Sequence, residues 1–222
     1  MKKLIIPFLV AICFGQSANA QLMANKKEFT RADSLRGMLT PLRTCYDINY
    51  YHLDVKINLD DQSVSGSNEF KFTATQDFNK LQFDLFENLR IDKIIYNNTE
   101  VPYTREFGAV FITFPKTIKK GSKDSFTVWY NGNPRVAKQP PWDGGFIFKK
   151  DKSGNPFVSV ACQGLGASVW WPNKDHQSDE VDSMLISIAV PKDLDEVSNG
   201  RLRSIVDLKD GYRQHNWFVA NP

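Results

Sequence analysis

The sequence predicts an all-β fold, a β-sandwich preceded by a short N-terminal helix. From Tyr50 onward apolar and polar residues alternate, as in Tyr51-His52-Leu53-Asp54-Val55, which is the period of a strand with one face in the core and one face in water. Short apolar runs then recur, separated by turn residues such as Asn97-Asn98, Gly108 and Gly121. Runs at this spacing are typical of sandwiches.

The first 20 residues have the pattern of a secretory signal peptide. Lys2 and Lys3 precede an apolar run from Leu4 to Phe14, and Ala18-Asn19-Ala20 is a small-x-small cleavage signal. The apolar run is too short to span a bilayer. We therefore expect a secreted or periplasmic protein that is free of the membrane once residues 1–20 are removed.

The charge balance argues against nucleic acid as a partner. The formal net charge is +3, and it falls to +1 when Lys2 and Lys3 leave with the signal peptide. A charge this small provides no electrostatic attraction to a phosphate backbone or to an anionic membrane surface.

The rest of the chain divides into an N-terminal segment, residues 21–49, and a β domain, residues 50–222. Apolar residues at helical spacing between Lys26 and Leu42 predict a short amphipathic helix that ends near Gly37 or Pro41. No linker rich in Pro, Gly or Ser interrupts the β domain. Its predicted strands are residues 50–59, 64–73, 81–85, 91–96, 101–103, 110–114, 126–130, 157–161, 184–190, 204–208 and 217–220.

Turn chemistry and loop composition complete this outline. Asp60-Asp61-Gln62-Ser63 predicts a turn between the first two strands, and Ser198-Asn199-Gly200 and Lys209-Asp210-Gly211 are hairpin signals. Residues 139–145 predict a long irregular connection. The run Phe157–Ala161 has the composition of a largely buried strand.

Two cysteines, Cys45 and Cys162, remain after processing. In an exported protein they could form a disulfide. Buried cysteine is also common as an inert small hydrophobe, and the sequence does not give the separation of the two.

The stretch that begins at Cys162 contains the candidate binding residues. A strand delivers Gln163 to its end, and Gly164 and Gly166 free the backbone and let a ligand approach closely. This combination indicates either a strained turn or the wall of a binding site. The neutral amide of Gln163 could bind a peptide carbonyl or an ammonium, or it could make a strand-end hydrogen bond within the fold.

Catalytic and metal signatures are absent from the sequence. His52, His176 and His215 are isolated, and there is no H-E-x-x-H, no G-x-S-x-G and no phosphate-binding loop. A nucleophile and base formed by Cys162 and His176 is disfavoured, because it would require a hydrogen-bonded pair. We therefore assign no catalytic residue and no metal ligand to this chain.

Two other features have a structural and a functional interpretation. The carboxylates of Asp175, Asp179, Glu180 and Asp182 could bind calcium, but the glycine and alternation of a calcium loop are missing, which favours a solvated turn with Asp175 accepting backbone N–H groups. The pair Trp170-Trp171 could stack on a sugar, although its place beside a strand end favours packing.

The same central residues resemble a known family. Cys162-Gln163-Gly164-Leu165-Gly166, Trp171-Pro172-Asn173-Lys174-Asp175-His176 and Ser178-Asp179-Glu180 are similar to the N-terminal domain of the gluzincin aminopeptidases, the aminopeptidase N and leukotriene-hydrolase family, and most of all to its secreted bacterial members. The strands Tyr51–Val55 and Leu81–Leu85 also match, so the resemblance covers nearly the whole mature chain.

The resemblance implies a saddle-like, mostly antiparallel β domain that covers one side of a C-terminal catalytic domain. In that family the catalytic domain binds the zinc, so the resemblance implies that this chain is a fragment without the zinc site. It also implies that Gln163 contacts the amino-terminal end of a peptide substrate. Two positions depart from the pattern: Ala161 stands where several relatives have Gln, and Val181 where Pro is usual.

Three functions are consistent with the sequence. We favour the substrate-capping N-terminal domain of a zinc aminopeptidase that removes N-terminal residues from peptides. The first alternative is a free-standing secreted β-sandwich that binds carbohydrate through Trp142, Trp170 and Trp171. The second is a non-catalytic relative whose β domain is a protein-interaction platform.

Overall fold

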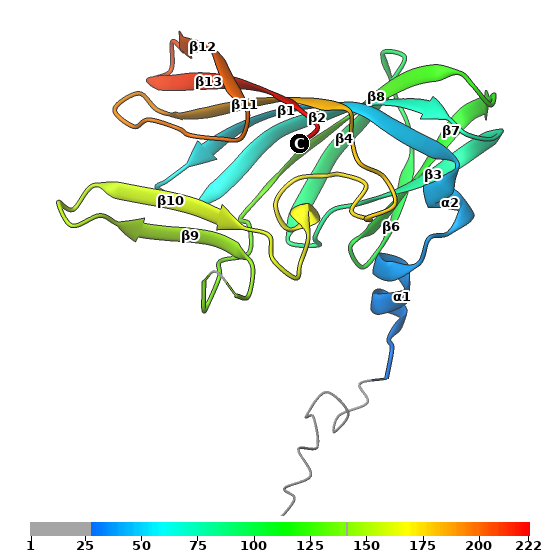
Figure 1. Ribbon diagram of the computed structural model, residues 1–222, viewed down its shortest axis with the longest axis horizontal. Helices are drawn as coiled ribbons and strands as arrows, with labels where there is room; N and C mark the ends of the chain where they lie inside the picture. The colour runs from blue at the N-terminus through cyan, green and yellow to red at the C-terminus, as the bar shows by residue number, and fades with distance from the viewer. Residues whose placement is uncertain (1–27, 141) are drawn as a thin grey trace, which may run out of the picture. The chain divides into compact units, whose positions relative to one another are not determined.

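The computed structural model describes residues 28–140 and 142–222, so the predicted signal peptide lies outside the described residues. Residues Arg31–Pro222 form one compact unit built almost entirely of β-structure (Figure 1). Its elements are α1 (Arg31–Gly37), α2 (Pro41–Thr44), β1 (Tyr46–Asn58), β2 (Ser63–Ala74), β3 (Phe78–Asp84), β4 (Leu89–Tyr96), β5 (Thr99–Glu100), β6 (Tyr103–Glu106), β7 (Ala109–Ile118), β8 (Lys123–Gly132), β9 (Gly145–Lys150), β10 (Pro156–Ala161), β11 (Ser183–Pro191), β12 (Arg201–Asp207) and β13 (Tyr212–Ala220).

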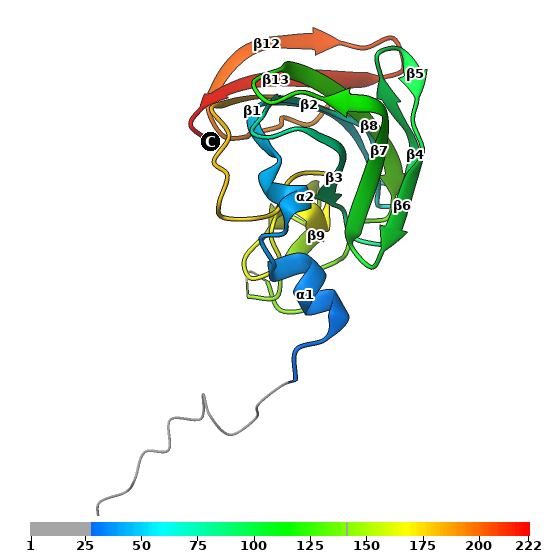
Figure 2. The ribbon, with the colours of Figure 1, turned by 90° about the vertical axis from the view of Figure 1, so that its right-hand side faces the viewer.

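The largest sheet has eight strands in the order β12-β13-β11-β1-β2-β8-β4-β5. Its ladders are antiparallel, except that β1 and β11 run parallel, with Leu53 opposite Ile186. Figures 1 and 2 show that this sheet is strongly twisted and curved. The predicted all-β, mostly antiparallel arrangement of several sheets is confirmed.

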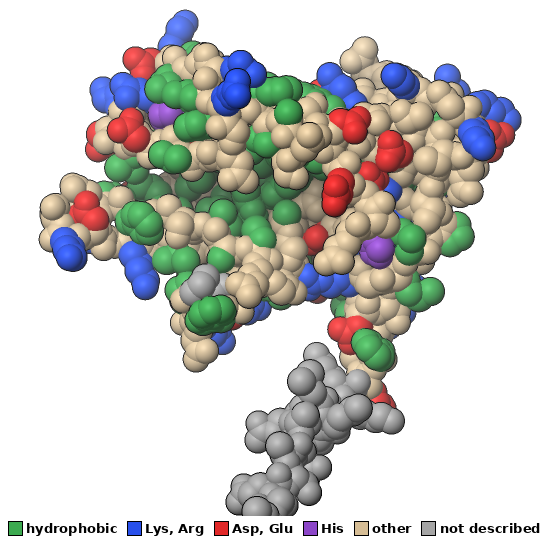
Figure 3. All heavy atoms as spheres, in the orientation of Figure 1, with side chains coloured by type: hydrophobic (Ala, Val, Ile, Leu, Met, Phe, Trp, Pro, Cys, Tyr) green, Lys and Arg blue, Asp and Glu red, His purple; other side chains and the backbone are tan. Residues whose placement is uncertain are grey.

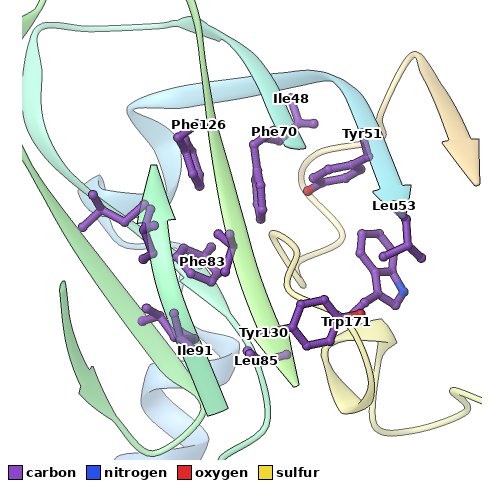
Figure 4. Packing of buried hydrophobic residues seen from close by; sticks show 14 of the residues in the cluster. Ile48, Tyr51, Leu53, Phe70, Phe83, Leu85, Ile91, Phe126, Tyr130 and Trp171 are labelled. Carbon is purple, nitrogen blue, oxygen red and sulfur yellow. The ribbon is translucent and has the colours of Figure 1, made fainter. Parts of the chain in front are cut away.

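The main core lies between one half of this sheet and a second sheet, β3-β7-β6. Aromatic rings fill it: Phe70 stacks on Phe126 with centroids 4.4 Å apart, and Phe83 from β3 lies 5.4 Å from Phe70 (Figure 4). Alternate side chains of β1 and β2 are buried in this core, because successive side chains of a strand point to opposite faces of the sheet. The two layers are those of a β-sandwich.

The strands β9 and β10 form a separate two-stranded sheet near the other half of the large sheet (Figure 1). The sequence analysis missed β9, although Phe146-Ile147-Phe148 is an apolar run that ends before a turn. It also predicted that Phe157–Ala161 is largely buried, and this is wrong: Phe157 is 53% exposed and Val160 is 39% exposed. Apolar composition alone did not distinguish a core strand from an outlying hairpin.

The N-terminal helix is confirmed, since α1 ends at Gly37, but the one-turn helix α2 was not predicted. The strand β1 begins at Tyr46, four residues before the alternating pattern. Lys209-Asp210-Gly211 forms the predicted hairpin turn between β12 and β13. The hairpin predicted at Ser198-Asn199-Gly200 is wrong, because β11 pairs with β13 and not with β12.

In the described part of the chain, no helix combines the length and the apolar character needed to cross a membrane.

Candidate functional site

The candidate site is the turn that follows β10, from Cys162 to Gly166. The Cys162 carbonyl accepts hydrogen bonds from the N–H groups of Leu165 (3.2 Å) and Gly166 (2.8 Å), which closes the turn. Gly164 and Gly166 have φ values of +72° and +75°. Residues with a Cβ rarely adopt this left-handed conformation, so both positions favour glycine.

Gln163 lies at the exposed tip of this turn. Within residues 28–140 and 142–222 its side-chain amide has no hydrogen-bond partner, whereas Cys162 behind it is only partly exposed. An amide in this state has its donors and its acceptor directed to solvent or to a ligand.

The two glycines differ in their surroundings. A Cβ on Gly164 would meet nothing within 4 Å, so the backbone here is open to a ligand. A Cβ on Gly166 would lie 2.1 Å from a carboxylate oxygen of Asp175, which is far inside contact distance. Gly166 therefore lets the turn pack against Asp175.

Arg36, in the last turn of α1, holds the turn from the other side. Its guanidinium donates to the carbonyl oxygens of Leu165 and Gly164, the second at 3.4 Å, and lies 5.6 Å from the ring centroid of Phe86. Helix α1, which the sequence predicted only as a short amphipathic helix, thus positions the loop that carries Gln163.

A chain of buried polar contacts connects the turn to β3. Asp175 accepts from the hydroxyl of Ser168 (2.6 Å) and from its N–H (3.3 Å), and the N–H of Asp175 donates to Asp84 (3.1 Å). Asp84 accepts two hydrogen bonds from Arg43, at 2.6 and 2.8 Å. Burial raises the pKa of Asp84 to about 6, and the adjacent Arg43 guanidinium opposes this rise because it favours the ionised carboxylate.

Asp179 and Asp182 of this segment also have side-chain partners, Lys174 and Asn49, whereas Glu180 is exposed. Lys174 is buried, pairs with Asp179 and donates to the Tyr46 carbonyl at 2.6 Å. Asp179 also accepts from the N–H of Ile48 at 3.1 Å. The prediction that Asp175 accepts backbone N–H groups is confirmed by the bond from the Ser168 N–H, but the predicted solvated turn is wrong at Asp179, because only 4% of its side-chain surface is exposed. In the described ranges, no three His, Cys, Asp or Glu side chains are grouped so that they could hold a metal ion.

The two tryptophans of the stretch are core residues. Trp170 and Trp171 are 8% and 9% exposed, and Trp171 packs edge-on against Tyr51 with centroids 5.2 Å apart (Figure 4). The packing interpretation is confirmed, because both rings belong to the buried core. Trp142, which is 73% exposed, is the remaining residue of that hypothesis.

Cys45 and Cys162, the two cysteines in the described part of the chain, are both free thiols. Burial raises the pKa of Cys45 to about 11 and also raises the pKa of Cys162. His176 contacts Ser178 at 2.9 Å through Nδ1. A thiol whose pKa is raised is a weak nucleophile at neutral pH, so Cys162 has the properties of a partly buried apolar residue.

A cleft of about 850 Å³ opens behind the turn, and the sequence analysis did not identify it. Its walls are β10, the inner faces of β1 and β11, and the loop of residues 194–199, with Cys162 and Ala167 at the end near the turn. In Figure 3 apolar side chains line this hollow between the large sheet and the hairpin. The sequence signal for this cleft was the set of alternate apolar residues in Met184–Val190, which line it in the structure.

No family model matches the chain, and no curated protein matches it. Solved structures do match it. The M1 zinc metallopeptidase from Deinococcus radiodurans superposes with a TM-score of 0.63 and 17% identity, over 78% of this chain and 38% of that chain. A mutant of that enzyme bound to a Tyr-Ser-Ala substrate gives a TM-score of 0.62 and 16% identity, over 78% of this chain and 39% of that chain.

Native yeast LTA4 hydrolase gives a TM-score of 0.60 and 12% identity, over 87% of this chain and 29% of that chain. These likenesses show the fold: the chain folds like the N-terminal region of such enzymes. The chain therefore spans well under half the length of the structures it matches.

Proposed function

We propose that this chain is the substrate-capping N-terminal domain of a zinc-dependent aminopeptidase, and that Gln163 contacts the amino-terminal end of the peptide. The observation that carries the proposal is the turn from Cys162 to Gly166, whose Gln163 amide has no partner among the described residues and whose backbone is held by Arg36 and packs on Asp175. The fold it shares with M1 zinc metallopeptidases supports the same function.

The chemistry of the turn suits this role. A peptide's ammonium group loses hydrogen bonds to water when it enters a closed site, which costs free energy unless acceptors replace them. The Gln163 carbonyl can replace one of these bonds, and the open backbone at Gly164 allows close approach. Because an amide has a dipole and no charge, Gln163 orients the peptide more than it attracts it.

The described residues offer no set of ligands for zinc, so the metal would be bound by the catalytic domain that our proposal places after this one. This chain then contributes binding and orientation only. The remaining partner would be that catalytic domain, and the signal pattern of residues 1–20 supports a periplasmic or secreted location.

Kinetics of the parent enzyme test the role of Gln163. We expect Gln163→Ala to lower kcat/KM for a peptide substrate by about 1–2 kcal/mol of transition-state stabilisation, the value of one substrate hydrogen bond. The matched control is Gln177→Ala, because Gln177 is also exposed and lies in the same stretch.

Equal losses in the two variants would show a general effect on the loop. Unchanged kinetics in a folded Gln163→Ala enzyme would remove Gln163 from the substrate site, and the aminopeptidase assignment would then rest on the fold alone.

A further inference from the structure

The cleft lies along the unpaired edge of β10. Five consecutive residues of this strand, Pro156 to Val160, line the cleft, whereas β9 contributes only Phe146. Side chains of a strand alternate between its two faces, so consecutive lining residues mean that the cleft meets the backbone edge of the strand. In the described residues β10 forms a ladder with β9 alone, whereas the far edge of β9 also has a bridge to Val136.

This edge can accept another strand. Every second residue of β10 directs its N–H and C=O away from β9, which is the template that an added strand uses. A two-stranded sheet is also marginal by itself, and a third strand beside an apolar surface stabilises it. Phe157 and Val160 of β10 are exposed, so an added strand would have apolar side chains of this sheet to pack against.

The opposite wall of the cleft is apolar. Alternate residues of β11, from Met184 to Val190, face it together with Leu53 and Ile57 from β1. The charged side chains that line the cleft are Asp195 and Glu196, and among the described residues no Lys or Arg does so. An occupant with apolar side chains and one basic group would complement these walls.

We propose that the cleft binds an extended apolar peptide segment, which adds as a third strand to the edge of β10 and places a Lys or Arg side chain beside Glu196. This interaction is separate from the proposed contact of Gln163 with a substrate terminus, because it uses the side of β10 and not the turn that follows it.

The surroundings of Glu196 fit a basic partner. The indole N–H of Trp217 donates to Glu196 at 2.6 Å, and burial raises the pKa of Glu196 to about 7. The loop itself also carries Lys192, Asp193 and Asp195, and on the neighbouring strand β13 the charges of Asp195 and Arg213 act on His215. Glu196 is therefore more fully ionised at pH 8 than at pH 5.5, and its attraction for a basic side chain increases over this interval.

Titration with a model peptide tests the proposal. The probe is acetyl-Lys-Val-Thr-Val-Thr-Val-amide, followed by tryptophan fluorescence and by NMR shifts of the β10 amides. We expect saturable binding at pH 8, with the largest shifts at Phe157–Val160. A second peptide with Pro in place of both Thr lacks two strand N–H donors, and we expect no binding of it.

Two pairs of comparisons test whether the apolar wall of the cleft and the charge of Glu196 contribute to peptide binding. Val160→Asp should abolish binding, and Val206→Asp should leave it unchanged, because Val206 is 45% exposed on β12, outside the cleft. A peptide with Gln in place of Lys should bind about fivefold more weakly at pH 8, and Glu196→Gln should remove this difference.

Equal binding of the proline peptide would show non-specific apolar adsorption and would overturn the proposal. A concentration-dependent dimer that Val160→Asp dissociates would show instead that a second copy of the chain occupies the cleft. Amide shifts confined to strands other than β10 would also contradict the proposal. None of these measurements depends on peptidase activity, so they test the cleft independently of the proposed function.

Discussion

The ion pair of Arg43 and Asp84 shows how single residues support the candidate site. Both side chains are almost fully buried, with 0% and 7% of their side-chain surface exposed. Arg43 also donates to the carbonyls of Leu35 and Arg36, and Asp84 accepts from the backbone of Asp175. One buried pair therefore connects α1, β3 and the segment that holds the Gln163 turn.

We predict that Asp84→Ala lowers the free energy of unfolding by about 3–5 kcal/mol, because it leaves the Arg43 guanidinium buried without its counter-ion. The control is Asp77→Ala, which removes an exposed ion pair with Lys119 and should cost much less, because water screens exposed charges. Urea unfolding at pH 7 measures both values. Similar small losses in the two variants would mean that water reaches Arg43 readily.

At the scale of elements, the loop of residues 192–200 joins β11 to β12 and is part of the cleft wall. It closes one side of the cleft and is held to β13 by the hydrogen bond between Trp217 and Glu196. Burial raises the pKa of Glu196 from 4.5 to about 7. The folded protein therefore binds this proton more tightly than the unfolded chain does.

This shift in the pKa of Glu196 predicts that the free energy of unfolding depends on pH. Between about pH 4.5 and pH 7 the unfolded chain ionises Glu196 while the folded protein keeps it protonated, so the contribution of Glu196 to stability falls as the pH rises. Glu196→Gln keeps an acceptor for Trp217 and should remove this part of the dependence. Unfolding free energies at pH 5 and pH 8 measure it, and parallel profiles of the variant and the unmodified protein would contradict it.

At the scale of the whole molecule, the β unit has two unequal halves. The half between β2, β8, β4 and the sheet β3-β7-β6 is a closed aromatic core. The half between β1, β11 and the hairpin β9–β10 has an open apolar cleft instead. Apolar surface of this extent usually indicates an interaction site.

Our proposed function predicts that the 222-residue chain alone hydrolyses no aminoacyl-anilide, with or without added zinc, because the described residues provide no metal ligand set. A chromogenic assay with and without a chelator measures this. Chelator-sensitive turnover by purified protein would reveal a metal site outside the described residues or formed on binding zinc, and the assignment of zinc to another domain would be wrong.

Local patterns of the sequence determined the β class, the hairpin turn at Asp210-Gly211, the end of α1 at Gly37 and the packing role of Trp170 and Trp171. They could do so because apolar alternation and turn chemistry act over a few neighbouring residues. The tertiary structure alone decided that Arg36 holds the Gln163 turn, that Arg43 pairs with Asp84 and that, within the described ranges, one edge of β10 stays free along a cleft. These contacts join residues up to about 130 positions apart in the sequence. Local patterns do not determine them, because strand pairing and buried ion pairs depend on how the whole chain packs.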